Sequence, residues 1–124
     1  MSSTALQGIH VLVVEDNYLV ASSVVSTLGA EGALIHGMVG TCSDALALLE
    51  EGAGPDVVLL DVNLGGEMSH SVADALRIRA IPFIMITGYD EQCLHPAYAG
   101  APICQKPFSM SSLIQQIRRS ARAA

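Results

Sequence analysis

Five polar side chains stand shortly after apolar runs of the sequence, where the strands of a parallel sheet would end. They are Glu15 and Asp16 after the first run, Asp61 after the third, Thr87 after the fourth and Lys106 after the fifth. Three ionised carboxylates within about 5 Å repel one another by a few kcal/mol per pair unless a cation neutralises them. Oxygen ligands without His or Cys select Mg²⁺, or a similar ion such as Mn²⁺. The residue types therefore predict a divalent-cation site with a hydroxyl and an ammonium group beside it.

Such a site suits phosphoryl transfer. A carboxylate beside the ion can attack phosphorus, because the cation screens the charge of the incoming phosphoryl group. Asp61 is the candidate nucleophile, and Lys106 and Thr87 would supply a counter-charge and a hydrogen-bond donor to the phosphate oxygens. Taken singly, each residue has an ordinary explanation as solvated surface, a turn or a cap. Their joint placement, each at the end of an apolar run, favours the chemical interpretation.

The apolar runs predict five strands. All are short, and three of them are apolar on both faces, as in central parallel strands that helices cover on each side, whereas the second and the fifth are weaker versions of this pattern. They span Ile9–Val14, Leu34–Val39, Val57–Leu60, Phe83–Ile86 and Pro102–Cys104. Between them, apolar residues recur at helical spacing in Leu19–Glu31, Ser43–Glu51, Ser69–Arg79 and Ser109–Arg122. Glu91–Tyr98 is a poor helical pattern that Pro96 interrupts, so the fourth helix is expected to be short or irregular.

Strand–helix alternation of this kind predicts an α/β fold with a doubly wound, five-stranded parallel sheet. Ligands of such sheets bind at the carboxyl ends of the strands, which is where the five polar residues stand. A chain of 124 residues favours a single domain, residues 1–124, with a core that spans about residues 9–122.

Composition excludes several classes of protein. Hydrophobic residues make up 51% of the chain and charged residues 15%, which excludes a disordered chain. The net charge of −6 argues against a nucleic-acid partner. No apolar run approaches the roughly 18 residues of a membrane span, so no membrane association is expected. Cys42, Cys93 and Cys104 are odd in number and widely spaced, which favours reduced thiols in a cytoplasmic protein.

Four motifs carry a resemblance to a known family. They are VVEDN at residues 13–17, LLDVNLGG at 59–66, ITGYD at 86–90 and KPF at 106–108. In this order and at these intervals they resemble the receiver domain of bacterial two-component response regulators. The resemblance implies a flavodoxin-like sheet and a phosphorylatable signalling switch of a phosphorelay. Such a switch accepts its phosphoryl group from a sensor histidine kinase or a histidine phosphotransfer protein.

The resemblance also implies roles for single residues. Asp61 is the expected phospho-acceptor, Thr87 the switch hydroxyl and Lys106 the partner of the phosphate. The expected Mg²⁺ ligands are Glu15, Asp16, Asp61 and the backbone carbonyl of Asn63. The Lys106–Pro107 peptide bond is expected to be cis, as is usual in the family.

The sequence departs from the common receiver pattern at Ile103, where most members have Tyr or Phe as a rotating switch side chain. The motif Phe-x-x-x-Thr-Gly-Tyr, at residues 83–89, is similar to that of a subfamily of stand-alone receivers. Ile103 is stiff and cannot report a movement of Thr87 by rotation. We therefore expect the signal to leave through residues 88–100, where glycines at both ends and Pro96 indicate low local stability.

Two functions from different classes remain open. The first is a signalling switch that acts through a downstream protein partner and promotes only its own phosphorylation and dephosphorylation. The alternative is a docking or dimerisation module that is not phosphorylated, and a homodimer is left open in either case. An enzyme of the haloacid-dehalogenase type is disfavoured, because residues 15–18 lack the second Asp that follows its nucleophile.

Overall fold

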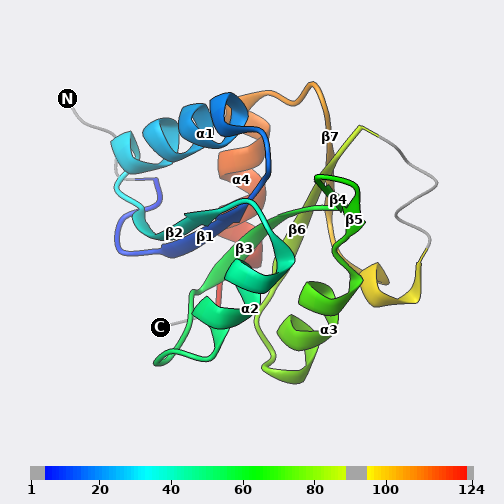
Figure 1. Cartoon of the computed structure of the whole chain (residues 1–124). Helices are drawn as coiled ribbons and strands as arrows, with labels where there is room; N and C mark the ends of the chain where they lie inside the picture. The colour runs from blue at the N-terminus through cyan, green and yellow to red at the C-terminus, as the bar shows by residue number, and fades with distance from the viewer. Residues whose placement is uncertain (1–4, 89–94, 123–124) are drawn as a thin grey trace.

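The five apolar runs form one parallel sheet with the strand order β2-β1-β3-β6-β7, as Figure 1 shows. The computed structural model describes residues 5–88 and 95–122. The strands are β1 (His10–Val14), β2 (Leu34–Val39), β3 (Val57–Asp61), β6 (Phe83–Thr87) and β7 (Ile103–Gln105). The helices are α1 (Tyr18–Ala30), α2 (Cys42–Leu49), α3 (His70–Ile78) and α4 (Met110–Ser120). The predicted α/β class and parallel sheet are confirmed, and each strand ends within one residue of its predicted bounds.

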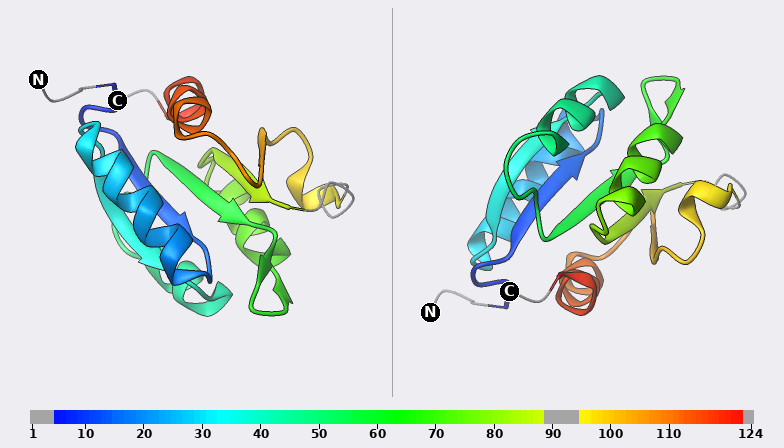
Figure 2. Two further views of the ribbon diagram at one scale, coloured as in Figure 1. Left: turned by 90° about the horizontal axis from the view of Figure 1, so that it is seen from above. Right: turned by 90° about the horizontal axis from the view of Figure 1, so that it is seen from below.

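Two apolar cores lie on the two faces of the sheet. Neighbouring residues of a strand point to opposite faces. On β1, Val11 and Val13 pack with α1 and α4, whereas Leu12 and Val14 pack with α2 and α3. Views from above and below show the sheet between these two pairs of helices (Figure 2). Helices cover both faces of the three central strands, β1, β3 and β6, which are buried almost throughout, and this is why the sequence shows continuous apolar runs there. The edge strands β2 and β7 are partly exposed.

Capping side chains fix where three of the helices begin. Asn17 accepts hydrogen bonds from the first turn of α1, Thr41 from that of α2 and Ser109 from that of α4. Each cap satisfies backbone N–H groups that have no partner within their own helix. The cap at Asn17 starts α1 directly after the acidic pair and so holds that pair at the end of β1.

The expected fourth helix is a single 3₁₀ turn where the structure describes it. Residues 91–94 of the expected helix lie outside the described residues, and the turn spans Pro96–Tyr98. Ala97 and Tyr98 are buried there. The buried Tyr98 side chain gives this part of the segment an apolar contact with the core, and its expected low local stability stays a prediction.

The strand order determines where a site can form. From β1 the chain crosses to β2 on one side, and from β3 it continues to β6 and β7 on the other side. The carboxyl ends of β1 and β3 are neighbours at this change of direction, which is where doubly wound sheets bind ligands. The acidic pair follows β1 and Asp61 ends β3.

The structure can be compared with two expectations from composition, which concern the cysteines and membrane-spanning helices. Cys42 and Cys104 are free thiols, as predicted, and Cys93 lies outside the described part of the chain. Among the helices of residues 5–88 and 95–122, none combines the length and the apolar character that crossing a membrane requires.

Candidate functional site

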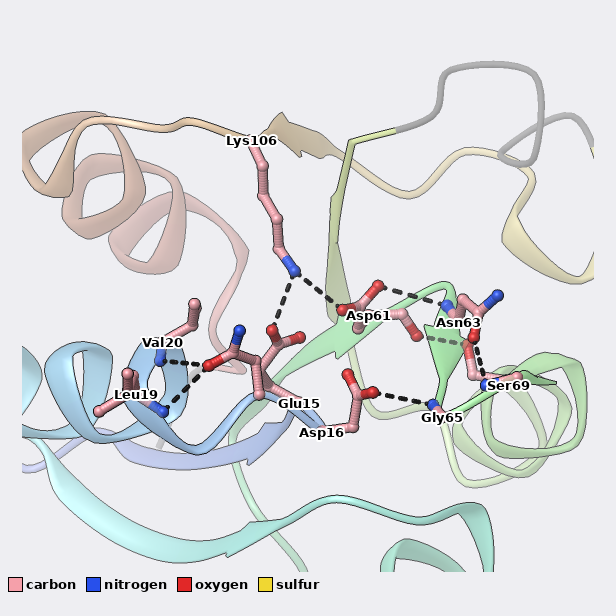
Figure 3. A network of polar contacts seen from close by, with 11 residues as sticks. Glu15, Asp16, Leu19, Val20, Asp61, Asn63, Gly65, Ser69 and Lys106 are labelled. Carbon is pink, nitrogen blue, oxygen red and sulfur yellow. Dashed lines mark hydrogen bonds and ion pairs between the residues drawn. The ribbon is translucent and has the colours of Figure 1, made fainter.

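The three carboxylates predicted to hold a cation lie together at the carboxyl end of the sheet (Figure 3). Oxygens of Glu15, Asp16 and Asp61 all lie within 4.8 Å of one another. The parallel pairing of β1 with β3 brings them together. Glu15 and Asp61 are buried, whereas Asp16 is exposed to solvent. A cation held there would have protein oxygens on one side and water on the other, which suits Mg²⁺ because it keeps several waters when bound.

Lys106 reaches across the end of the sheet to this cluster. Its Nζ lies 2.9 Å from Glu15 Oε1 and 2.9 Å from Asp61 Oδ2. Burial by itself would lower the pKa of Lys106, but hydrogen bonds and attraction from the two carboxylates outweigh it and raise the pKa above its ordinary value. Lys106 is therefore a fixed positive charge within reach of an anion attached to Asp61.

Glu15 lies in surroundings that disfavour its charge. Burial and the nearby Asp61 carboxylate raise the pKa of Glu15 from 4.5 to about 7, although Lys106 opposes the shift. Its Oε2 is buried and has no hydrogen-bond partner among the described residues. A buried carboxylate oxygen without a partner is costly, and a divalent cation among the three carboxylates would remove that cost. The donor set, which is acidic and consists of oxygen atoms, fits Mg²⁺ or Mn²⁺.

A short hairpin after β3 positions Asp16, and no apolar run predicted it. It consists of β4 (Asn63–Leu64) and β5 (Glu67–Met68), joined by Gly65 and Gly66, which both have positive φ. The backbone N–H of Gly65 donates to Asp16 Oδ2 at 2.9 Å. The Gly-Gly pair was the available signal, because the common two-residue hairpin turn needs positive φ at both positions.

Asn63 orients the second oxygen of Asp61. The backbone N–H of Asn63 donates to Asp61 Oδ1 at 3.3 Å, and its own side-chain oxygen accepts from the N–H of Gly66 at 2.7 Å. With Lys106 on Oδ2, both oxygens of the Asp61 carboxylate have a defined direction. The role of the Asn63 carbonyl as a metal ligand stays a prediction.

Thr87 and Lys106 are joined through the backbone. Thr87 is buried at the end of β6, and its carbonyl accepts a hydrogen bond from the N–H of Lys106 at 2.8 Å. The Lys106–Pro107 peptide bond is cis, as expected. Ile103 lies on the edge strand β7 and is half exposed. Tyr89, the last residue of the Phe-x-x-x-Thr-Gly-Tyr motif, lies outside the described residues.

Comparisons with known proteins identify the same family as the motifs. Residues 11–118 match the family described as the response regulator receiver domain. The phyllosphere-induced regulator PhyR of Methylorubrum extorquens is 30% identical over 114 residues, which are 86% of this chain and 42% of the relative. The sensory transduction protein RegX3 of Mycobacterium tuberculosis is 33% identical over 112 residues, which are 87% of this chain and 48% of the relative. The chain thus spans about half the length of these curated relatives.

Solved structures of similar chains share the fold. SdrG from Sphingomonas melonis Fr1 is 38% identical, with a TM-score of 0.75 over 91% of this chain and 94% of that chain. The BeF3-activated conformation of SdrG from Pseudomonas melonis Fr1 is 37% identical, with a TM-score of 0.72 over 94% and 96% of the two chains. The family match at residues 11–118 includes all five polar residues of the site, from Glu15 to Lys106. The chain therefore belongs to the receiver domains of two-component response regulators.

Proposed function

We propose that this receiver domain is a phosphorylatable switch in which Asp61 accepts the phosphoryl group. The main support is the arrangement around Asp61, which lies 2.9 Å from Lys106 and within 4.8 Å of two further carboxylates. A docking module that is never phosphorylated has no need to keep three carboxylates that repel one another. SdrG, which is similar over most of its length, has a BeF3-activated conformation, and this agrees with phosphorylation of this class of chain.

Each residue of the site has a part in the proposed transfer. One oxygen of Asp61 attacks phosphorus, and the bond from phosphorus to the donor's leaving group breaks, which leaves an acyl phosphate. Lys106 then donates to a phosphate oxygen, and the Thr87 hydroxyl donates to another. Mg²⁺, when bound, supplies charge neutralisation for the phosphoryl group. The proposed ligands are Glu15, Asp16, Asp61 and the carbonyl of Asn63.

An apolar groove beside Lys106 offers a binding place for the phosphodonor protein. The groove has a volume of about 570 Å³ and lies between α1 and the start of α4, lined in part by Leu19, Val20, Pro107, Phe108 and Met110. Leu19 is 79% exposed at its rim. Exposed apolar side chains next to the acceptor suit the apolar face of a helix that carries a phosphohistidine. The donor we propose is a sensor histidine kinase or a histidine phosphotransfer protein.

Leu19→Glu should slow phosphotransfer from a histidine kinase that phosphorylates the wild type, by about tenfold or more. Labelling by acetyl phosphate should be unchanged, because a small donor needs no docking surface. Ile78→Glu is the matched control, since Ile78 is 83% exposed on α3. The rates of phosphorylation by the kinase and by acetyl phosphate are measured for the wild type and for both variants. An equal loss with both donors, or a loss with neither, would contradict docking at this groove.

The proposed function is tested by reaction of the purified chain with acetyl phosphate and Mg²⁺. Intact mass spectrometry should show the addition of one phosphoryl group, which hydroxylamine removes because it cleaves acyl phosphates. Chelation of the metal by EDTA should prevent the addition. A chain that neither acetyl phosphate nor phosphoramidate modifies would favour the unphosphorylated docking module.

A further inference from the structure

Ser69 stands where a serine would normally cap a helix, but its hydroxyl is used elsewhere. The residue is fully buried just before α3, and its side chain makes no hydrogen bond to the first turn of that helix, all of which is described. Its Oγ lies instead 2.6 Å from the backbone carbonyl of Asp61 and 3.0 Å from the hydroxyl of Tyr98. A side-chain cap stabilises a helix, so this use of the hydroxyl leaves α3 without that stabilisation.

The direction of the two hydrogen bonds follows from the proton count. A carbonyl can only accept, so the single proton of the Ser69 hydroxyl goes to Asp61. Tyr98 must then donate its proton to Ser69 Oγ. Hydrogen bonds in series polarise and strengthen one another. The N–H of Ser69 also donates to the carbonyl of Val62 at 2.8 Å, so Ser69 holds two successive peptides at the phospho-acceptor.

Tyr98 anchors the other end of this chain in residues 95–101. Its N–H donates to the carbonyl of His95, and its own carbonyl accepts from the N–H of Ala101. Arg77 of α3 donates from Nε to the carbonyl of Ala97 at 2.8 Å. Residues 95–101 are therefore joined to the backbone of Tyr98 and, through Arg77, to α3. A displacement of Tyr98 would act on its neighbours through these backbone hydrogen bonds.

We infer that Ser69 and Tyr98 form a positioning link that passes the state of Asp61 to residues 95–101. The inference rests on the proposed function, since phosphorylation is what changes the state of Asp61. An acyl phosphate needs more room than a carboxylate, and a shift of the Asp61 peptide reaches Tyr98 through two short hydrogen bonds. This route does not require an aromatic residue at position 103.

The far end of the link reaches the surface of the protein. Four residues of the segment are exposed, namely His95, Pro96, Ala99 and Gly100. A movement of Tyr98 would therefore change a surface that a protein partner can contact. The loss of one hydrogen bond is enough to change the populations of two nearly balanced states several-fold.

Nuclear magnetic resonance of the ¹⁵N-labelled chain tests the link. Tyr98→Phe removes the hydroxyl and keeps the buried ring, and Ser69→Ala removes both hydrogen bonds. The amide shifts of Ala97, Ala99 and Ala101 are measured before and after addition of beryllofluoride with Mg²⁺. In the wild type these amide shifts should change when beryllofluoride is added. In each variant the change should be less than about half as large as in the wild type. Tyr18→Phe, the same change at a tyrosine that is 70% exposed, should respond like the wild type.

Rescue and labelling separate the possible outcomes. Ser69→Thr keeps the hydroxyl and should keep the response, which loss of packing alone would not explain. Suppose that acetyl phosphate labels the wild type, but that the amide shifts of Ala97, Ala99 and Ala101 change as much in Tyr98→Phe as in the wild type. This result overturns the link and leaves the proposed function standing. Shifts that stay constant in a labelled wild type also overturn it. An unlabelled wild type overturns the proposed function and the link together.

Discussion

Asp61→Asn is expected to abolish labelling by acetyl phosphate, with a loss of at least about 100-fold. An amide oxygen is a far weaker nucleophile toward phosphorus than a carboxylate. Asp61 is held for attack by Lys106 on one oxygen and by the N–H of Asn63 on the other. The other two carboxylates are placed differently, because Glu15 is buried and Asp16 accepts from the hairpin turn at Gly65. They are not expected to take over the reaction.

The fold should survive this substitution. Asparagine has nearly the shape of aspartate and can still accept from the N–H of Asn63. The variant loses the attraction between Asp61 and Lys106 but also the repulsion between Asp61 and Glu15, and the two effects oppose each other. The free energy of unfolding, measured by urea denaturation, should change by no more than about 2 kcal/mol.

A matched variant separates loss of the nucleophile from loss of charge. Asp74→Asn makes the same change at an exposed position on α3 and should be labelled like the wild type. Labelling is measured by intact mass, and the modified residue is located by peptide mapping after borohydride reduction of the acyl phosphate. Full labelling of a folded Asp61→Asn protein would falsify the assignment of the nucleophile.

The sequence predicted the three central strands of the sheet, β1, β3 and β6, well because both of their faces are buried. A run such as Val57–Leu60 is apolar at every position, and few other structures require such a short continuous run. The parallel arrangement then placed the residues that follow each run at one edge. This is why the grouping of Glu15 and Asp16 with Asp61 was confirmed without any side-chain geometry.

Contacts between segments that share no pattern could not be predicted. Ser69 has the sequence position of a helix cap, and only the packing of α3 against residues 95–101 turns its hydroxyl toward Asp61 and Tyr98. Arg122, just after α4, donates to the backbone carbonyls of Ala53 and Pro55. Backbone carbonyls have no side-chain signature, so the sequence cannot indicate such partners.

The difference in burial within the acidic pair was also beyond the sequence. Glu15 and Asp16 are adjacent acidic residues, and their order alone does not show which one faces the core. The structure buries Glu15 and exposes Asp16. That difference gives the site a dependence on pH that can be measured.

Without a divalent cation, the free energy of unfolding should fall as the pH rises from about 5 to about 8. Burial and Asp61 raise the pKa of Glu15 from 4.5 to about 7, so the folded state holds a proton that the unfolded state releases. Such a group adds stability below its unfolded pKa, and this stability is lost as the pH passes through the folded pKa. One pKa unit corresponds to about 1.4 kcal/mol, so the expected loss is on the order of 1–3 kcal/mol.

Mg²⁺ should reverse most of this loss. Glu15 is a proposed ligand in its ionised form, and binding to the native state alone stabilises it by mass action. A proton on Glu15 competes with the cation, so millimolar Mg²⁺ should stabilise the protein more at pH 8 than at pH 5. Urea denaturation at both pH values, with Mg²⁺ or with EDTA, measures the four free energies that this comparison needs.

Glu15→Gln identifies the group responsible. The amide keeps the shape of the side chain and cannot ionise, so the metal-free variant should be more stable than the wild type at pH 8 and should gain less from Mg²⁺. Glu51→Gln makes the same change at an exposed position and should behave like the wild type. Burial and His95 lower the pKa of His70, which favours folding as the pH rises, but this opposite effect is present in every variant. An equal pH dependence in the wild type and Glu15→Gln would mean that another group titrates, and that a cation does not compensate for the burial of Glu15.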